Sequence, residues 1–150
     1  MHLTGKHTFN ASVDTLWNML MDPDILVRVT PGISKLEQIE ADRYKAIAEV
    51  KMGPVSGSFA GNMEVAEKSE PEYFTLKVKQ ESRIGNVSAD VKIMLRPLAD
   101  HETEMAFEGD AKLSGLLART GNRVLSGVAN TLTRQFFQSL EKEVEASQTA

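Results

Sequence analysis

Hydrophobic and polar residues follow two different periods along this chain, and the longer period occupies its last fifth. Between residues 113 and 146, apolar and small side chains recur every three or four positions, which is typical of one face of an amphipathic helix. The predicted face carries Leu117, Gly121, Val124, Val128, Thr131, Gln135 and Ser139, and it is widened by Leu116, Thr120, Gly127, Leu132, Phe136 and Leu140. A helix of about 30 residues is roughly 45 Å long, so a wide apolar surface elsewhere must cover this face.

The middle of the chain alternates between apolar and polar residues with a period of two, which predicts a series of β-strands. Turn signals such as Gly53-Pro54 and Gly85-Asn86 separate the alternating runs. The expected strands are residues 34–40, 43–52, 55–66, 73–82, 86–96 and 103–113.

The N-terminal part predicts one more strand and two short helices. Residues 2–10 alternate like the later strands. Ser12 is placed to cap a helix that stops near Asp22, and Asp22 can cap a second helix with Pro23 at its first position. The order of elements is therefore strand, helix, helix, six strands and a long helix, which is an α+β arrangement.

This order predicts how the elements pack. Consecutive strands joined by short turns form an antiparallel sheet with one apolar face, and that face and the long helix can bury each other. A flat sheet would touch the helix along only one line, so the sheet must curve around it. Gly53, Gly57 and Gly61 favour such bending, or the close approach of a backbone or a ligand.

Composition narrows the class of protein. We expect one domain over residues 1–146, followed by a disordered tail at residues 147–150. A net charge of −4 argues against a general nucleic-acid binder, and the absence of cysteine excludes disulfides and thiolate metal sites. No apolar run is long enough to span a membrane, and no secretion signal is visible, so we expect a cytoplasmic protein.

Motifs for catalysis or metal binding are not found. His2, His7 and His101 lack the spacing of convergent zinc ligands, so we expect no metal and no cofactor. The segment from Gly53 to Gly57 has neither the strand–turn–helix context of a nucleophile elbow nor the lysine of a phosphate-binding loop. We therefore predict no catalytic residues.

Several local strings together resemble the CoxG family, named for the CoxG subunit of carbon monoxide dehydrogenase, within the START-like (SRPBCC) superfamily. The most specific part of the resemblance is the run from Val50 to Gly61, which reads VKMGPVSGSFAG. Further matching strings are Phe9-Asn10-Ala11, Val13 and Trp17, Asp22-Pro23 with Leu26 and Pro31-Gly32, and Gly121, Arg123, Gly127, Val128, Ala129 and Phe136-Phe137. The resemblance covers essentially the whole chain.

The resemblance implies a helix-grip fold, in which a seven-stranded antiparallel sheet curves around the C-terminal helix and encloses a cavity. It also implies a non-catalytic protein that binds a hydrophobic, quinone- or lipid-like molecule. Its implied partner is a molybdenum-type carbon monoxide dehydrogenase or a related molybdenum hydroxylase, served through membrane recruitment or delivery of an electron carrier, with peripheral contact at the inner face of the membrane. Two alternatives remain: an enzyme like the polyketide cyclases and dehydratases, and a pure protein-interaction module.

The inward apolar residues can be read as a filled core or as the wall of a cavity. Alternation alone favours a packed core, whereas the resemblance favours a cavity beside the glycines of strand and helix. The candidate ligand-binding residues are Val55, Gly57, Phe59, Gly61, Met63, Leu76, Val91, Met105, Phe107, Leu117, Thr120, Gly121, Val124, Gly127 and Val128. The second half of the helix, residues 132–144, is expected to be ordinary core with Phe136 as its main anchor.

Overall fold

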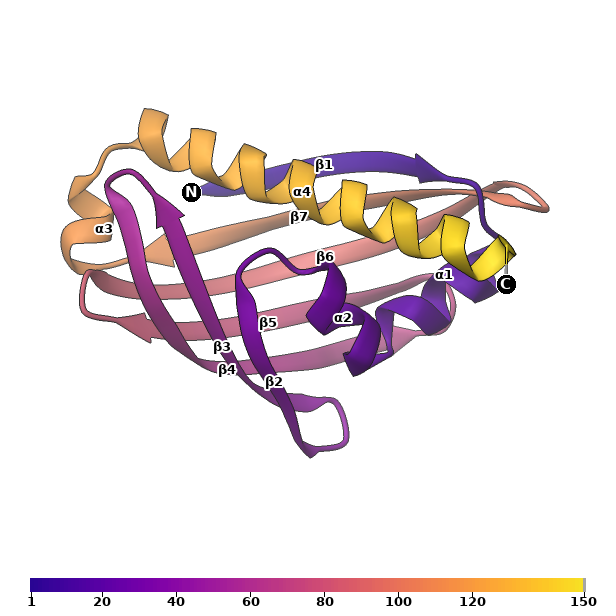
Figure 1. Cartoon of the computed structure of the whole chain (residues 1–150), viewed down its shortest axis with the longest axis horizontal. Helices are drawn as coiled ribbons and strands as arrows, with labels where there is room; N and C mark the ends of the chain where they lie inside the picture. Colours follow the sequence, from indigo (N-terminus) through magenta and orange to yellow (C-terminus); the bar gives the residue numbers. More distant parts are fainter. Residues whose placement is uncertain (150) are drawn as a thin grey trace.

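The predicted order of elements is present in the computed structural model, which describes residues 1–149 (Figure 1). Its elements are β1 (His2–Phe9), α1 (Val13–Leu20), α2 (Pro23–Val29), β2 (Ile33–Glu40), β3 (Arg43–Met52), β4 (Val55–Ser69), β5 (Tyr73–Ser82), β6 (Gly85–Ala99), β7 (Glu102–Leu113), α3 (Gly115–Arg119) and α4 (Asn122–Thr149). The α+β fold class and the succession of strands and helices are thus confirmed.

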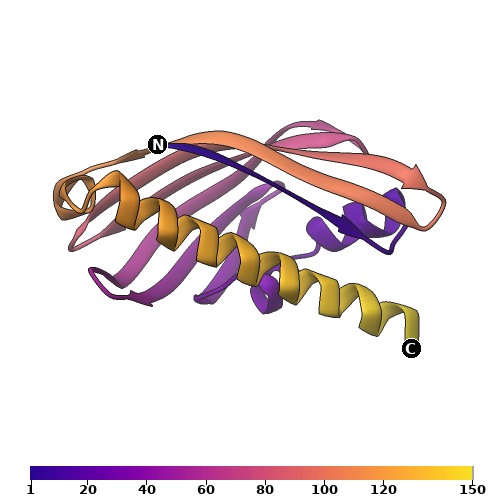
Figure 2. The same ribbon diagram turned by 90° about the horizontal axis from the view of Figure 1, so that it is seen from above.

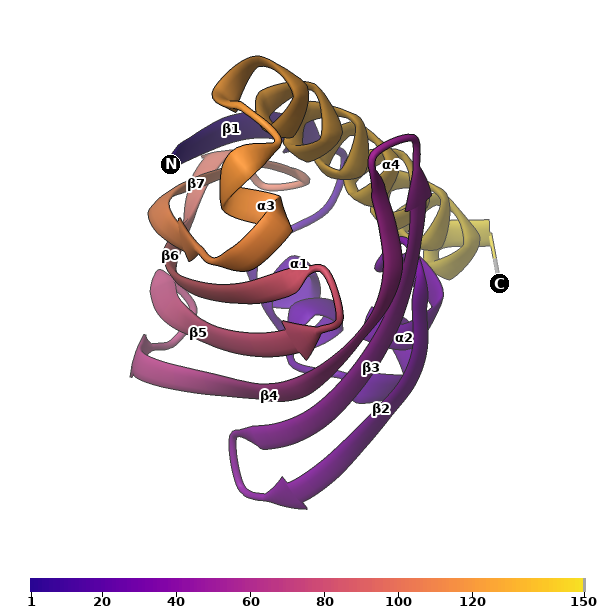
Figure 3. The same cartoon turned by 90° about the vertical axis from the view of Figure 1, so that its left-hand side faces the viewer.

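The strands form one antiparallel sheet in the order β1-β7-β6-β5-β4-β3-β2. The first strand of the chain pairs with the last one, with Gly5 opposite Phe107, so β1 and β2 form the two edges. Seen from one end, the sheet is strongly curved, and its concave face surrounds the space beneath α4 (Figure 3). This is the helix-grip arrangement that the sequence predicts.

Two glycines permit the curvature of the sheet. A Cβ atom on Gly61 would overlap the carbonyl oxygen of Lys79, and one on Gly109 would overlap that of Asp90. Only a residue without a side chain lets the neighbouring strand approach so closely. Of the two predicted roles, the close approach of a neighbouring backbone therefore applies to Gly61, whereas Gly53 and Gly57 have no such contact.

Both short helices begin where their capping residues predict. The Ser12 hydroxyl accepts a hydrogen bond from the Thr15 backbone N–H at 3.2 Å, and α1 starts at the next residue, Val13. The Asp22 carboxylate accepts one from the Asp24 backbone N–H at 2.9 Å, with Pro23 at the first position of α2. These bonds satisfy backbone donors that a helix start leaves without a partner.

The long C-terminal helix is broken near its start, which corrects the prediction of one continuous helix. Leu113 ends β7, the short α3 follows, and Gly121 has a φ of +99° between α3 and α4. Glycine is the residue that adopts this left-handed conformation readily. At its other end α4 continues to Thr149, three residues past the expected end at Ala146, and Ala150 lies outside the described residues.

The break also explains why the predicted helix face is only partly correct: Val128, Leu132, Phe136 and Leu140 face inward as predicted, whereas Leu125, Ala129 and Phe137 were not predicted to do so. The side chains of α4 that face the interior are Leu125, Val128, Ala129, Leu132, Phe136, Phe137, Leu140 and Val144. At most turns of α4 the observed inward face lies one residue later than the first set of predicted positions. Val124 and Gly127, which were predicted to face inward, are exposed. The prediction applied one hydrophobic period to both α3 and α4. Gly121 interrupts the helix between them, so the inward positions of α4 do not continue those of α3.

The helix α4 runs across the concave side of the sheet (Figure 2). Two apolar clusters fix it there, one toward each end. The larger one joins α1 to the second half of α4, where Leu140 and Val144 are fully buried. The smaller one joins Leu117 and Leu125 to Val55 and Phe59 of β4. The candidate site occupies the space between the clusters.

Candidate ligand-binding cavity

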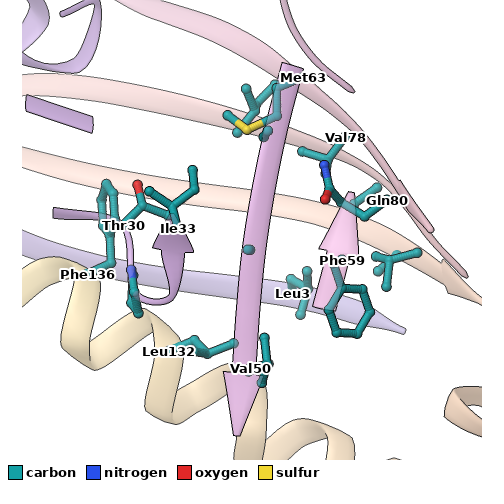
Figure 4. Close-up of a pocket in the computed structure, with 18 of the residues that line it drawn as sticks. Leu3, Thr30, Ile33, Val50, Phe59, Met63, Val78, Gln80, Leu132 and Phe136 are labelled. Atoms are coloured by element: carbon teal, nitrogen blue, oxygen red, sulfur yellow. The ribbon is translucent and has the colours of Figure 1, made fainter. Parts of the chain in front are cut away.

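A cavity of about 490 Å³ lies between the concave face of the sheet and α4 (Figure 4). It is bounded by the inward residues of β3, β4 and β5, by α4, and by the segment that joins α2 to β2. Its wall is almost entirely hydrocarbon, and the polar side chains that reach it are those of Thr30, Tyr44 and Gln80. Ligand pockets of roughly 300–1,000 Å³ with few polar groups typically hold hydrophobic small molecules.

Seven of the fifteen candidate residues line this cavity, and eight do not. Those in its wall are Val55, Phe59, Met63, Leu76, Met105, Leu117 and Val128. Those outside it are Gly57, Gly61, Val91, Phe107, Thr120, Gly121, Val124 and Gly127. Whether any of these residues contacts a ligand stays a prediction.

Two of the residues outside the wall pack against glycines of the sheet. Phe107 lies over Gly5, where a Cβ would approach the ring to 2.5 Å, and its ring centroid is 6.1 Å from that of Phe137. Val91 covers Gly109, at 3.0 Å from the position of a Cβ. Both side chains point inward as predicted, but they belong to the packed part of the interior.

The candidates at the start of the helix point away from the cavity or bond to their own backbone. The Thr120 hydroxyl donates to the Leu116 carbonyl oxygen at 2.9 Å, the local bond that competes with any ligand contact. No atom lies within 4 Å of a Cβ built on Gly121 or Gly127. These glycines therefore leave space on the outside of the helix.

The cavity extends further under the second half of α4 than the sequence suggests. Leu132 and Phe136 border it, although both were expected in an ordinary core. Phe137, not Phe136, is the more buried ring, and it stacks on His7 with 5.3 Å between ring centroids. The expected role of Phe136 as the main anchor is thus wrong.

Several further wall residues that sequence reasoning missed come from β3, from α2, from the segment that joins α2 to β2, and from the first residue of β2. They are Leu26, Thr30, Pro31, Ile33, Tyr44, Ala46, Ala48 and Val50. The alternation in β3 contained a signal, because its inward side carries two alanines where large side chains would fill the space.

The polar side chains of the wall are neutral, and the N-terminal ammonium of Met1, a residue that also borders the wall, donates to the Ala111 carbonyl oxygen at 2.8 Å. Tyr44 is 6% exposed, and its burial, followed by the nearby Asp42 carboxylate, raises the pKa of the phenol above its ordinary value of 10.0. The Gln80 oxygen Oε1 is buried without a hydrogen-bond partner among residues 1–149. The cavity therefore suits an uncharged ligand.

The sides of α4 are not packed equally closely. The helix packs against β1 on one side and against α2 on the other, and within residues 1–149 no comparable packing joins it to β3. Val50 of β3 and Val128 and Ala129 of α4, which border the cavity here, are only half-buried. This side of the first half of α4 is therefore packed less closely against the sheet than the sides that face β1 and α2.

The fold is the START-like helix-grip fold, and comparison with solved structures agrees. The structure of a conserved protein from Geobacillus kaustophilus is 33% identical, covers 98% of this chain and 97% of its own, and superimposes with a TM-score of 0.94. A START superfamily protein from Mycobacterium smegmatis is 14% identical over 97% of both chains, with a TM-score of 0.75. The Zhui aromatase/cyclase from Streptomyces sp. R1128 is 12% identical over 97% of this chain and 93% of its own, with a TM-score of 0.74.

The family itself is identified by sequence. The family described as the CoxG subunit of carbon monoxide dehydrogenase matches residues 5–145. The chain therefore belongs to the CoxG family. No curated protein matches it, and none of the helices within residues 1–149 combines the length and the hydropathy needed to cross a membrane.

Proposed function

We propose that this protein binds one hydrophobic small molecule, quinone- or lipid-like, in the cavity between the sheet and α4. The apolar wall around about 490 Å³ is the observation that carries this proposal. Water has few polar partners on such a wall, whereas an apolar ligand gains dispersion contacts and leaves water on binding. In this proposal, the ligand enters at the less closely packed side between α4 and β3.

The family suggests the setting in which such a ligand is used. Its description links it to carbon monoxide dehydrogenase. We propose that the protein is a non-catalytic accessory of a molybdenum-type enzyme of this kind, in which it supports recruitment to the membrane or delivers a quinone as electron carrier. A pull-down with the tagged protein should recover the dehydrogenase if this partnership exists.

Contact with a membrane is supported by exposed apolar residues at the α3 end. Leu116 is 58% exposed and Val124 is 38% exposed, and Arg119 and Arg123 lie on the same two turns. Apolar side chains flanked by arginines suit an anionic lipid surface. We propose that this end rests on the membrane while a ligand is exchanged.

Vesicle sedimentation tests this orientation. Wild-type protein should pellet with vesicles of phosphatidylcholine and phosphatidylglycerol, and a Leu116→Glu/Val124→Glu variant should not. The control variant, Ile39→Glu/Leu98→Glu, changes two other exposed apolar residues and should bind normally. Equal binding by both variants would contradict the orientation.

Ligand binding is tested by native mass spectrometry of the protein purified under mild conditions and after addition of 2-decyl-1,4-benzoquinone. We expect a complex with one ligand molecule. A protein that retains neither a cellular lipid or quinone nor the added one, under any condition, would exclude the carrier function.

A catalytic alternative rests on Tyr44. It is the one side chain with an acidic proton in the cavity wall described here, and its neutral phenol could donate a proton to a bound substrate. The aromatase/cyclase with the same fold suggests the kind of reaction to test for this alternative. Conversion of an aromatic polyketide precursor by the wild-type protein, abolished in a Tyr44→Phe variant, would favour the enzyme over the carrier.

A further inference from the structure

Gln80 is the polar residue of the cavity that the protein itself leaves unsatisfied. Its oxygen Oε1 is buried without a hydrogen-bond partner among residues 1–149. Figure 4 shows the amide directed into the cavity from β5. A buried polar atom without a partner costs free energy, because it has given up its hydrogen bonds to water.

The residues around Gln80 cannot supply the missing bond. In the transverse row of paired strand positions, Gln80 lies between Gly61 of β4 and Val87 of β6, and Ala46 and Leu113 come next on either side. None of these four side chains contains a polar atom. Gly61 and Ala46 are also small, so they leave open the part of the cavity beside the amide.

A bound molecule can supply the missing hydrogen bond of Gln80 instead. An amide group offers one acceptor and two donors, and rotation by half a turn exchanges their positions. It can therefore bond to a carbonyl oxygen or to a hydroxyl group. The amide carries no charge, and no lysine, arginine or histidine side chain lines the cavity wall within the described residues. The N-terminal ammonium of Met1, a residue that borders the wall, already donates to the Ala111 carbonyl oxygen at 2.8 Å. A carboxylate would therefore lose hydration with little compensation.

We propose that Gln80 is the polar anchor of the cavity and binds a single neutral oxygen group, carbonyl or hydroxyl, on an otherwise apolar ligand. This inference rests on the proposed ligand-binding function. Gln80 and Val87 lie near the smaller apolar cluster, whereas Thr30 and Tyr44 border the cavity close to α2 and β2. The oxygen group of the ligand is thus held toward the α3 end, and its apolar body extends beneath the second half of α4.

Three probes with the same decyl chain test the anchor by equilibrium dialysis: 2-decyl-1,4-benzoquinone, decylbenzene and 4-decylbenzoate. The wild-type protein should bind the quinone about tenfold more tightly than decylbenzene, since one net hydrogen bond corresponds to roughly that factor. The benzoate should bind most weakly. In a Gln80→Leu variant the affinity for the quinone should fall about tenfold, and that for decylbenzene should not fall.

The control is Gln38→Leu, which makes the same change at an exposed position on β2 outside the cavity wall and should leave all three affinities unchanged. Gln80→Met serves if Gln80→Leu does not fold. Unchanged quinone affinity in the Gln80 variants would overturn the anchor and leave the carrier function intact. Failure of the wild-type protein to bind either neutral probe would overturn both.

Discussion

Gln80 affects stability as well as binding at the scale of a single residue. Its buried oxygen has no partner among residues 1–149, so the folded state bears a cost that the hydrated unfolded chain does not. Replacement by leucine should raise the free energy of unfolding of the ligand-free protein by about 1 kcal/mol. Urea denaturation measures this change.

The control for this measurement is Gln38→Leu, which changes an exposed glutamine on β2 and should leave stability nearly unchanged. A loss of stability in Gln80→Leu would mean that the amide has a partner within the folded protein. It would also remove the basis for the polar anchor.

A second residue-scale prediction concerns the ion pair between α2 and α4. Arg28 Nε donates to Glu143 Oε1 at 2.7 Å, and Nη2 donates to Oε2 at 3.2 Å. The hydrogen bonds from Arg28 lower the pKa of Glu143 below its ordinary value of 4.5. Because the folded state binds this proton less readily than the unfolded state, the pair stabilises the fold above pH 4.5.

This contribution should be lost as the pH falls below 4.5 through the lowered pKa of Glu143. Melting temperatures of the wild-type protein and of Glu143→Gln, recorded between neutral and acidic pH, should therefore differ near neutrality and converge at acidic pH. Glu145→Gln, at an exposed position on α4, should show no such convergence. Parallel curves for wild type and Glu143→Gln would contradict the assignment.

Residue patterns identified which side chains point inward, but not which of them border open space. Phe107 and Val91 face inward with Met63 and Leu76, yet they cover glycines while the latter two line the cavity. That difference depends on side chains from neighbouring strands and not on the alternation within one strand. Gln80, in contrast, could have been found, because it continues the inward side of β5 two residues after Val78.

At the scale of elements, the strand ends at the tight turns were predictable because they depend on local turn chemistry, whereas β4 and β6 each run three residues past the predicted ends at residues 66 and 96. The bounds of β3 and β5 match the predicted ranges at both ends, and the turn before β4 contains Gly53 with a φ of +57°. The helix break at Gly121 was not predictable, since a single glycine is tolerated within a helix. On one side of the break, α3 is held at the β5–β6 turn, where the Leu117 backbone N–H donates to the Ile84 carbonyl oxygen at 2.8 Å.

Two glycines of the C-terminal region give opposite predictions that test this break. Gly121 has a φ of +99°, so a Gly121→Ala change forces an unfavourable conformation and should lower stability by about 1–2 kcal/mol. Gly127 lies within α4 with open space around its Cβ position, so Gly127→Ala should raise stability by about 0.5–1 kcal/mol.

Urea denaturation of both variants measures these changes, and each variant serves as the control for the other. If one continuous helix ran through this region, as the hydrophobic period alone suggests, both alanines would stabilise the protein. A gain in stability for Gly121→Ala would therefore contradict the break between α3 and α4.

At the scale of the whole molecule, the architecture followed from the order of elements, but the cavity did not. One curved sheet and one long helix were required to bury each other, because each carries one apolar face. The cavity exists because the two apolar clusters close only the ends, while small residues such as Ala46, Ala48 and Ala129 line the space between them. The cavity volume depends on side chains from many elements, so no single stretch of sequence predicts it.

The volume of the cavity can nevertheless be changed by a substitution at one position. Ala129 borders the cavity from α4 on its less closely packed side and is half-buried. An Ala129→Trp change should place the indole in the cavity and reduce binding of 2-decyl-1,4-benzoquinone at least about tenfold, because ligand and indole compete for the same apolar wall. Filling a cavity commonly stabilises a protein by about 0.5–2 kcal/mol, so the melting temperature should stay equal or rise.

The matched control is Asn130→Trp, which adds the same side chain at the adjacent, exposed position of the same helix. It should bind the quinone like the wild-type protein. Loss of binding in both variants would indicate that the ligand contacts the outer surface of α4, and unchanged binding in Ala129→Trp would place the ligand outside the cavity. Only loss in Ala129→Trp alone, without loss of stability, fits a ligand held between the sheet and the helix.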